Sequence, residues 1–266
     1  MQVGNLGQRV IVANWKMNHT RQQAENFMQD FSERMQAWYE QKASAIGSVQ
    51  IVICPPYTAL SAVHPYLPRI GGFLGAQNVH WQERGAFTGD IAADMLLELG
   101  CTHVILGHSE RRKYAAESDQ EIAMRLETAL RHGLQPILCV GENLEQRMAG
   151  QAETVVGEQL EIVLDRVRKE LLGRDMMIAY EPVWAIGSGQ PATPHDVREM
   201  ARSIRRHWQR ILDGAASCRI LYGGSVRAEN IAGFLTIGEM DGALVGGDSL
   251  QADSFFRIVQ AAAEAT

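Results

Sequence analysis

Short, continuous runs of apolar residues alternate along the chain with longer segments whose apolar positions recur every three to four residues. Eight runs have the short form: Val10–Ala13, Val49–Cys54, Phe73–Ala76, His103–Leu106, Ile137–Val140, Met176–Ala179, Ile220–Tyr222 and Ala243–Val245. Continuous runs of this length are typical of strands that are buried on both faces of a parallel sheet. We therefore predict eight parallel strands.

The segments between these runs predict amphipathic helices. Apolar residues fall on one face of a helix within residues 24–38, 156–171 and 197–211. Ser118 begins a capping-box sequence, and Thr193, followed by proline, is typical of a helix start. These apolar faces indicate packing against a core and carry no information about function.

Eight strand-then-helix units in 266 residues predict one closed (β/α)8 barrel. Length alone fits either one large domain or two small ones. The chain has no Pro-, Gly- or Ser-rich linker and no low-complexity segment, so we expect a single domain over residues 1–266. An open doubly wound α/β sheet is the alternative architecture for the same pattern.

Composition narrows the possible partners and location. The formal net charge is −6 and the basic residues form no long run, which argues against a nucleic-acid partner. No apolar run approaches the roughly 18 residues that span a bilayer, and Met1–Gln8 does not resemble a signal peptide. The four cysteines form no CxxC pair, so we expect buried, reduced thiols in a cytoplasmic protein.

Polar residues that could carry chemistry follow six of the predicted strands. They are Asn14 and Lys16, Gly107-His108-Ser109-Glu110, Gly141-Glu142, Glu181, Gly223-Gly224-Ser225 and Gly246-Gly247. The C-terminal ends of barrel strands meet at one rim, where the active sites of such barrels are built. We therefore predict that these six groups form one site.

The glycine pairs after the seventh and eighth strands predict a phosphate site. Backbone N–H groups commonly hold phosphate at this part of a barrel rim, and glycine lets the backbone approach an oxyanion closely. Two tight turns without a ligand are the alternative interpretation of Gly223-Gly224-Ser225 and Gly246-Gly247.

The segment after Glu181 predicts a mobile loop that closes over a substrate. Gly187–Ala192 matches the dinucleotide pattern G-x-G-x-x-A, but the helix signal begins only at Thr193, so these glycines do not open a helix. A glycine-containing loop between two prolines fits a lid better. Glu181, directly before this loop at the end of its strand, is our candidate catalytic base.

Lys16 and His108 could each have a purely structural role. Lys16 could form a salt bridge with Glu110, which is compatible with catalysis, and His108 could be a buried histidine with satisfied hydrogen bonds. The position of His108 beside Ser109-Glu110-Arg111-Arg112, at the start of a turn or helix, favours a functional role. Histidine and cysteine spacings match no metal-binding motif, so we expect no metal site.

Several longer motifs resemble those of the triosephosphate isomerase family. They follow the family's order from about Val10 to Phe256, and they are Asn14-Trp15-Lys16-Met17-Asn18, Gly107–Arg112, Ala179–Gly187, Tyr222–Val226 and Val245–Gly247. The resemblance implies a TIM barrel that interconverts dihydroxyacetone phosphate and D-glyceraldehyde 3-phosphate through an enediol(ate). This isomerisation belongs to glycolysis and gluconeogenesis and uses neither a cofactor nor a metal.

The resemblance also implies roles for individual residues. Glu181 would remove the proton next to the carbonyl, and His108 would polarise the carbonyl oxygen as a neutral imidazole. Lys16 would offset developing negative charge. The implied substrate-binding residues are Asn14, Lys16, Gly187, Ser225, Gly246 and Gly247.

Residues 75–90 resemble the family's interdigitating dimer loop, which implies a homodimer in which Thr88 reaches toward the neighbouring active site. A long surface loop packed on itself is the alternative. The chain departs from the family pattern at Asp248 for Ala, Ser188 for Thr, Asp90 for Glu and, in the second hinge of the lid, Pro191. We expect Asp248 to weaken substrate binding if its carboxylate points inward.

Two other functions fit parts of the pattern. A phosphate-binding barrel aldolase would need a Schiff base on Lys16, which lies past its strand rather than inside the barrel. A silent barrel that serves as an interaction surface is disfavoured because Lys16, His108 and Glu181 are all present.

Overall fold

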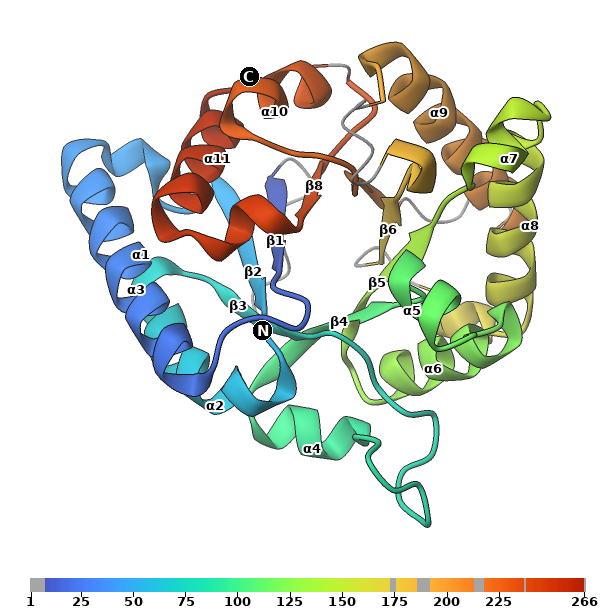
Figure 1. Ribbon diagram of the computed structural model, residues 1–266, viewed down its shortest axis with the longest axis horizontal. Helices are drawn as coiled ribbons and strands as arrows, with labels where there is room; N and C mark the ends of the chain where they lie inside the picture. The colour runs from blue at the N-terminus through green and yellow to red at the C-terminus, as the bar shows by residue number, and fades with distance from the viewer. Residues whose placement is uncertain (1–7, 173–175, 186–191, 213–217, 237, 266) are drawn as a thin grey trace.

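The computed structural model describes residues 8–172, 176–185, 192–212, 218–236 and 238–265, and its strands form a closed barrel (Figure 1). The strands are β1 Arg9–Asn14, β2 Val49–Cys54, β3 Phe73–Ala76, β4 Cys101–Leu106, β5 Gln135–Val140, β6 Met177–Tyr180, β7 Arg219–Tyr222 and β8 Gly242–Val245. Each strand is parallel to its neighbours, and β1 pairs with β8, so that Val10 lies opposite Gly242. The predicted barrel is confirmed, and the open-sheet alternative is wrong because this pairing closes the sheet.

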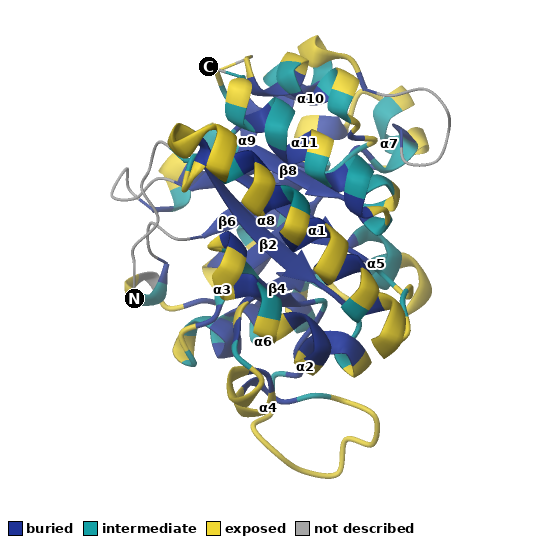
Figure 2. Ribbon diagram, turned by 90° about the vertical axis from the view of Figure 1, so that its left-hand side faces the viewer, coloured by how far each residue is buried: buried dark blue, intermediate teal, exposed yellow. Residues whose placement is uncertain are grey.

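Helices surround the barrel, with their buried faces turned toward the strands and their exposed faces outward (Figure 2). The α-helices are α1 Arg21–Gln41, α2 Leu60–Val63, α3 Leu67–Ile70, α4 Ala93–Glu98, α5 Ser109–Tyr114, α6 Asp119–Arg131, α7 Leu144–Met148, α8 Ala152–Asp165, α9 Pro194–Ile211, α10 Ala228–Leu235 and α11 Ala252–Glu264. Short 3-10 helices are η1 Ala43–Ala45, η2 Tyr57–Ala59, η3 His64–Tyr66, η4 Lys169–Leu171, η5 Val183–Ala185 and η6 Gly247–Leu250. Among the helices described, none is both long and apolar enough to cross a membrane.

Both helix starts predicted from capping sequences are confirmed. Ser118 caps α6, where its side chain accepts a hydrogen bond from the backbone N–H of Glu121. Thr193 caps α9 in the same way through Asp196, with a proline in the first turn. The predicted helix over residues 156–171 is too long, because α8 ends at Asp165 and a 3-10 helix follows.

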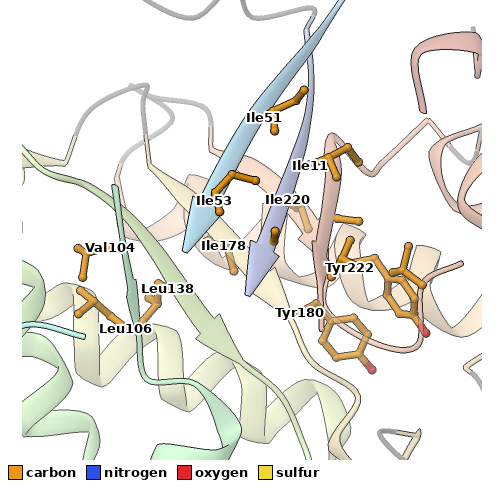
Figure 3. Close-up of a cluster of buried hydrophobic side chains, with 14 of the residues drawn as sticks. Ile11, Ile51, Ile53, Val104, Leu106, Leu138, Ile178, Tyr180, Ile220 and Tyr222 are labelled. Atoms are coloured by element: carbon orange, nitrogen blue, oxygen red, sulfur yellow. The ribbon is translucent and has the colours of Figure 1, made fainter. Parts of the chain in front are cut away.

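The core has two layers, which explains why the strands read as continuous apolar runs. Val10 and Val12 point into the barrel, whereas Ile11 and Ala13 pack against the surrounding helices. Figure 3 shows side chains of the outer layer, among them Ile11, which extend from several strands of the barrel. Since both faces of each strand are buried, neither face retains a polar pattern.

A buried polar network lies near the N-terminal ends of β2, β4 and β7. The Gln50 side chain bridges its neighbours, with its amide nitrogen 3.1 Å from His103 Nε2 and its oxygen accepting from Arg219 at 2.6 Å. Thr102 Oγ1 lies 2.7 Å from His103 Nδ1. Burial, reinforced by the charge of Arg219, lowers the pKa of His103 to about 3, so this imidazole is neutral in the folded protein.

Candidate active site

The C-terminal strand ends surround a cavity of about 240 Å³, at the rim that the sequence predicts. Its lining residues are Asn14, Lys16, His108, Glu181, Gly223, Gly224, Ser225, Val226, Arg227, Leu244, Gly246, Gly247 and Asp248. The cavity therefore unites the described catalytic and substrate-binding residues that the family resemblance implies, which are Asn14, Lys16, His108, Glu181, Ser225, Gly246 and Gly247. Gly187, also predicted to bind substrate, lies outside the described residues.

Lys16 follows β1 in an unusual backbone conformation that its neighbours hold in place. Its φ of 53° lies in the left-handed region, which costs energy for a residue with a side chain. The backbone N–H of Lys16 donates to Asn14 Oδ1 at 3.0 Å, and its carbonyl accepts from Gln77 at 2.9 Å. Lys16 Nζ lies 2.6 Å from Glu110 Oε1, so the predicted salt bridge is present in a side chain that also lines the cavity.

His108 is placed by the turn from β4 into α5. It is the N-cap of α5, and its Nδ1 accepts a hydrogen bond from the backbone N–H of Glu110 at 3.2 Å. An Nδ1 that accepts carries no proton, so this pattern fits the neutral Nε2–H form. Burial disfavours the charged ring, but the carboxylates of Glu181 and Glu110 together outweigh burial and raise the pKa of His108.

Glu181 follows β6 and is only 2% exposed. Its Oε2 accepts from the backbone N–H of Ser109 at 2.9 Å, and its Oε1 lies 2.9 Å from His108 Nε2. Burial acts to raise the pKa of Glu181, but His108, the Ser109 N–H and Lys16 outweigh it, so the pKa is lowered. Glu181 is therefore an ionised carboxylate inside a nearly closed site.

Glycines give Glu181 the room that this position requires. A Cβ on Gly141 would lie 1.8 Å from the carbonyl oxygen of Glu181, and one on Gly223 would lie 2.9 Å from its Cγ. Both distances are shorter than real contacts allow. The strand ends on either side of Glu181 must therefore carry glycine for the backbones to approach this closely.

The wall formed by the β7 and β8 loops is suited to an anion. Ser225 follows β7, and Gly246 and Gly247 lead from β8 into the start of η6, so the start of a helix lines the cavity. Arg227 and Asp248 line the same wall. Asp248, the departure from the family pattern, thus belongs to the site.

Two residues of the predicted groups, Ser109 and Glu142, make contacts that the sequence did not indicate. Ser109 holds Glu181 through its N–H and, at 3.3 Å, its hydroxyl. Glu142 was predicted at the rim, but it does not line the cavity and is fully buried, where its Oε1 accepts from Tyr180 and Trp184. This prediction is wrong because residues that leave a strand alternate between the interior and the helix layer.

Acidic, histidine and cysteine side chains are not grouped for metal binding in the part of the chain that the structure describes. No cluster of three or more such residues could hold an ion there. The four cysteines are free and buried.

Comparisons with known proteins identify the family of this chain. The family model for triosephosphate isomerase matches residues 9–262. Triosephosphate isomerase from Symbiobacterium thermophilum is 44% identical over 258 residues, covering 96% of this chain and 97% of the relative, and that from Dictyoglomus turgidum is 45% identical over 254 residues, covering 95% and 98%. The crystal structure of triosephosphate isomerase from Bartonella henselae superposes with a TM-score of 0.81 at 36% identity, covering 96% of this chain and 98% of that one. This chain belongs to the triosephosphate isomerase family, and its reaction is the interconversion of dihydroxyacetone phosphate and D-glyceraldehyde 3-phosphate, a step of glycolysis.

Proposed function

We propose that Glu181 is the base and His108 the electrophile of this isomerisation. The observation that carries the assignment is their contact, with Glu181 Oε1 2.9 Å from His108 Nε2 in a cavity that both line. The lowered pKa of Glu181 keeps it ionised and ready to accept a proton.

The proton movements balance without a cofactor. When substrate binds, the Glu181 carboxylate gives up its hydrogen bond from Ser109 and contacts the substrate instead. It then takes a proton from the carbon next to the carbonyl. The electron pair moves to the carbonyl oxygen, toward which His108 directs its Nε2–H. His108 then passes a proton between the two oxygens, and protonated Glu181 returns a proton to the neighbouring carbon.

Lys16 supplies the positive charge for the enediolate, and Asn14 a further polar contact. The Lys16 backbone is fixed at φ 53° by hydrogen bonds on both sides, so Nζ is preorganised before substrate binds. A preorganised charge in a nearly closed site stabilises developing negative charge more than a mobile one. Lys16 lies past the end of β1 and its Nζ is paired with Glu110, which disfavours the Schiff-base aldolase.

The phosphate of the substrate would lie against Ser225, Gly246 and Gly247. Backbone donors at the start of η6 and the absence of side chains on the glycines support this placement. A phosphate contact from Gly187 stays a prediction, as do the single domain over residues 1–266 and the cytoplasmic location.

We also infer that the chain acts as a homodimer. Residues 82–90 are exposed, and the exposed fraction of Phe87, an apolar residue, is 41%. This segment projects from the body of the molecule next to α4 (Figures 1 and 2). A second cavity, of about 550 Å³, is lined by residues 17–20 together with Gln23, Pro56, Thr58, Leu250 and Gln251, and Met17 there is 96% exposed. A projecting loop and an open cavity on one chain fit a symmetric exchange between two copies. This arrangement would bring Thr88 of each copy close to Lys16 of its partner.

A coupled assay of glyceraldehyde 3-phosphate isomerisation tests the assignment of the base. Glu181→Gln keeps the shape and one hydrogen-bond acceptor but cannot take a proton. We expect its kcat to fall by roughly 10²–10⁴-fold with folding unchanged. A folded variant that retains the full rate would show that Glu181 is not the base.

A further inference from the structure

Glu142 forms the centre of a buried group that flanks Glu181 on both sides. Its Oε1 accepts from the Tyr180 hydroxyl at 3.1 Å and from Trp184 Nε1 at 2.8 Å, and Arg147 lies 3.4 Å away. Among the described residues, its second oxygen has no hydrogen-bond partner. Tyr180 directly precedes Glu181 and Trp184 follows three residues later, so this carboxylate holds the chain before and after the proposed base.

The backbone couples the same group to Glu181. The N–H of Glu181 donates to the Val140 carbonyl at 2.8 Å, and the N–H of Val183 donates to the Glu142 carbonyl at 3.1 Å. Gly141, between these two acceptors, packs against the Glu181 carbonyl with no space for a side chain. A displacement of Glu142 is therefore transmitted to the backbone of Glu181.

Arg147, on α7, joins this group to the start of α9. Its guanidinium carbon lies 5.1 Å from the centre of the Trp184 ring, and its NH2 forms an ion pair with Asp196. Asp196 is also engaged with the N-cap of α9, since it accepts from the Thr193 hydroxyl at 2.6 Å. The guanidinium of Arg147 thus contacts Glu142, which follows β5, Trp184, which follows β6, and Asp196 in the first turn of α9.

We propose that Arg147 is a positioning residue for the isomerisation, which sets the orientation of Glu181 by holding Glu142 and Trp184 against the N-terminus of α9. The proposal rests on the assignment of Glu181 as the base. Arg147 lies outside the substrate cavity and acts only through its neighbours.

The geometry needs the planar fork of arginine. Arg147 reaches two carboxylates and stacks on an aromatic ring at once, whereas a lysine ammonium acts as a point charge. Its charge also opposes the effect of burial on Glu142. Burial raises the pKa of Glu142, and the groups that face it (Trp184, Tyr180 and Arg147) act in the opposite direction. Without Arg147 the pKa of Glu142 rises further. A protonated Glu142 accepts hydrogen bonds from Tyr180 and Trp184 less well than the carboxylate does.

Arg147→Met in the full chain tests the proposal. A misplacement of a reacting group by about 1 Å costs roughly 100-fold, so a smaller shift of Glu181 should lower kcat by on the order of tenfold, with KM within about twofold. The acid limb of the kcat profile should move to higher pH because Glu142 then titrates. Arg147→Lys should restore the acid limb and recover part of kcat. Glu142→Gln combined with Arg147→Met should lack the pH shift.

Two further variants separate positioning from general destabilisation. Asp196→Asn keeps the shape of the α9 cap but removes the ion pair, and it should reproduce part of the kcat loss. Arg202→Met removes an exposed arginine of α9 that pairs with Glu199 and Glu239, and it should leave kcat unchanged. A folded Arg147→Met with wild-type kcat and pH profile would overturn the proposal, as would an equal loss in Arg202→Met. The rate of Glu181→Gln tests the base independently of either result.

Discussion

Oε1 of Glu181 lies 2.9 Å from Nε2 of His108, and each residue shifts the pKa of the other. Burial alone would raise the pKa of Glu181 and lower that of His108. The contact is the largest influence that opposes burial in each case, because the carboxylate favours a charged ring and the ring favours a charged carboxylate; Ser109 and Lys16 add to it for Glu181, and Glu110 adds to it for His108. The proposed base and electrophile are therefore tuned as a pair, and a change in one alters the other.

Replacement of His108 by Gln should affect both the rate and the pH dependence. Loss of the electrophile should lower kcat by roughly 10²–10⁴-fold, with a small change in KM. The pKa of Glu181 should rise, since burial then acts without the opposing effect of the ring, so the acid limb of kcat/KM moves to higher pH. Steady-state kinetics across pH measure both effects, with the exposed His64→Gln as the control. An unchanged acid limb would contradict the coupling of the two residues.

The neutral, buried His103 should make the fold less stable in mild acid. Its folded pKa is about 3 and its unfolded value about 6.5, so between these values the unfolded chain binds a proton that the folded chain excludes. Stability is therefore lost as pH falls below about 6.5, by about 2 kcal/mol at pH 5 from this group. Urea unfolding at pH 7 and pH 5 should show a smaller acid loss in His103→Gln than in the wild type. An equal loss in both proteins would show that His103 does not contribute.

Asp248 should weaken phosphate binding, because it adds a carboxylate to the wall that holds Ser225 and Gly247. Asp248→Ala should lower KM by roughly two- to fivefold, leave kcat unchanged and strengthen inhibition by inorganic phosphate. The effect should shrink at high ionic strength. Glu229→Ala, an exposed change on α10, is the matched control. A KM that stays the same or rises would mean that the Asp248 carboxylate does not act on the substrate.

Thr88→Arg should dissociate the proposed dimer, since it places a bulky charge on the projecting loop. The variant should sediment as a monomer and lose roughly tenfold or more in kcat, because the cavity that would receive this loop adjoins Lys16. Ile46→Arg changes another exposed apolar residue and should remain dimeric and active. A wild-type protein that is monomeric at micromolar concentration would contradict the dimer directly.

The barrel could be predicted from the sequence because each strand is buried on both faces. Continuous apolar runs therefore located all eight strands, with ends that differ by at most two residues. The helix was predicted to reach residue 171 because Val167 and Leu171 pack against the same core, although α8 itself ends at Asp165. Periodicity reports burial and does not report where the backbone leaves the helix.

The site could be predicted only in part, because the sequence does not show which side chains after a strand point into the cavity. Motif order placed His108 and Glu181 at one rim, but it could not show which residues after a strand face the interior. Glu142 and Glu181 both follow strands, yet Glu142 turns toward the helices. The ion pair between Arg147 and Asp196 joins two separate helices, and neither helix pattern indicates the other.

Isomerisation in D2O, followed by NMR, tests the central claim most directly. Proton removal by Glu181 creates an exchangeable proton on the carboxyl group, so product should carry deuterium at the carbon that received it. We expect such labelling with the wild type, and its loss in step with activity in Glu181→Gln. Full-rate isomerisation without any deuterium in the product would contradict an enediolate formed by Glu181 and would indicate a direct hydride shift.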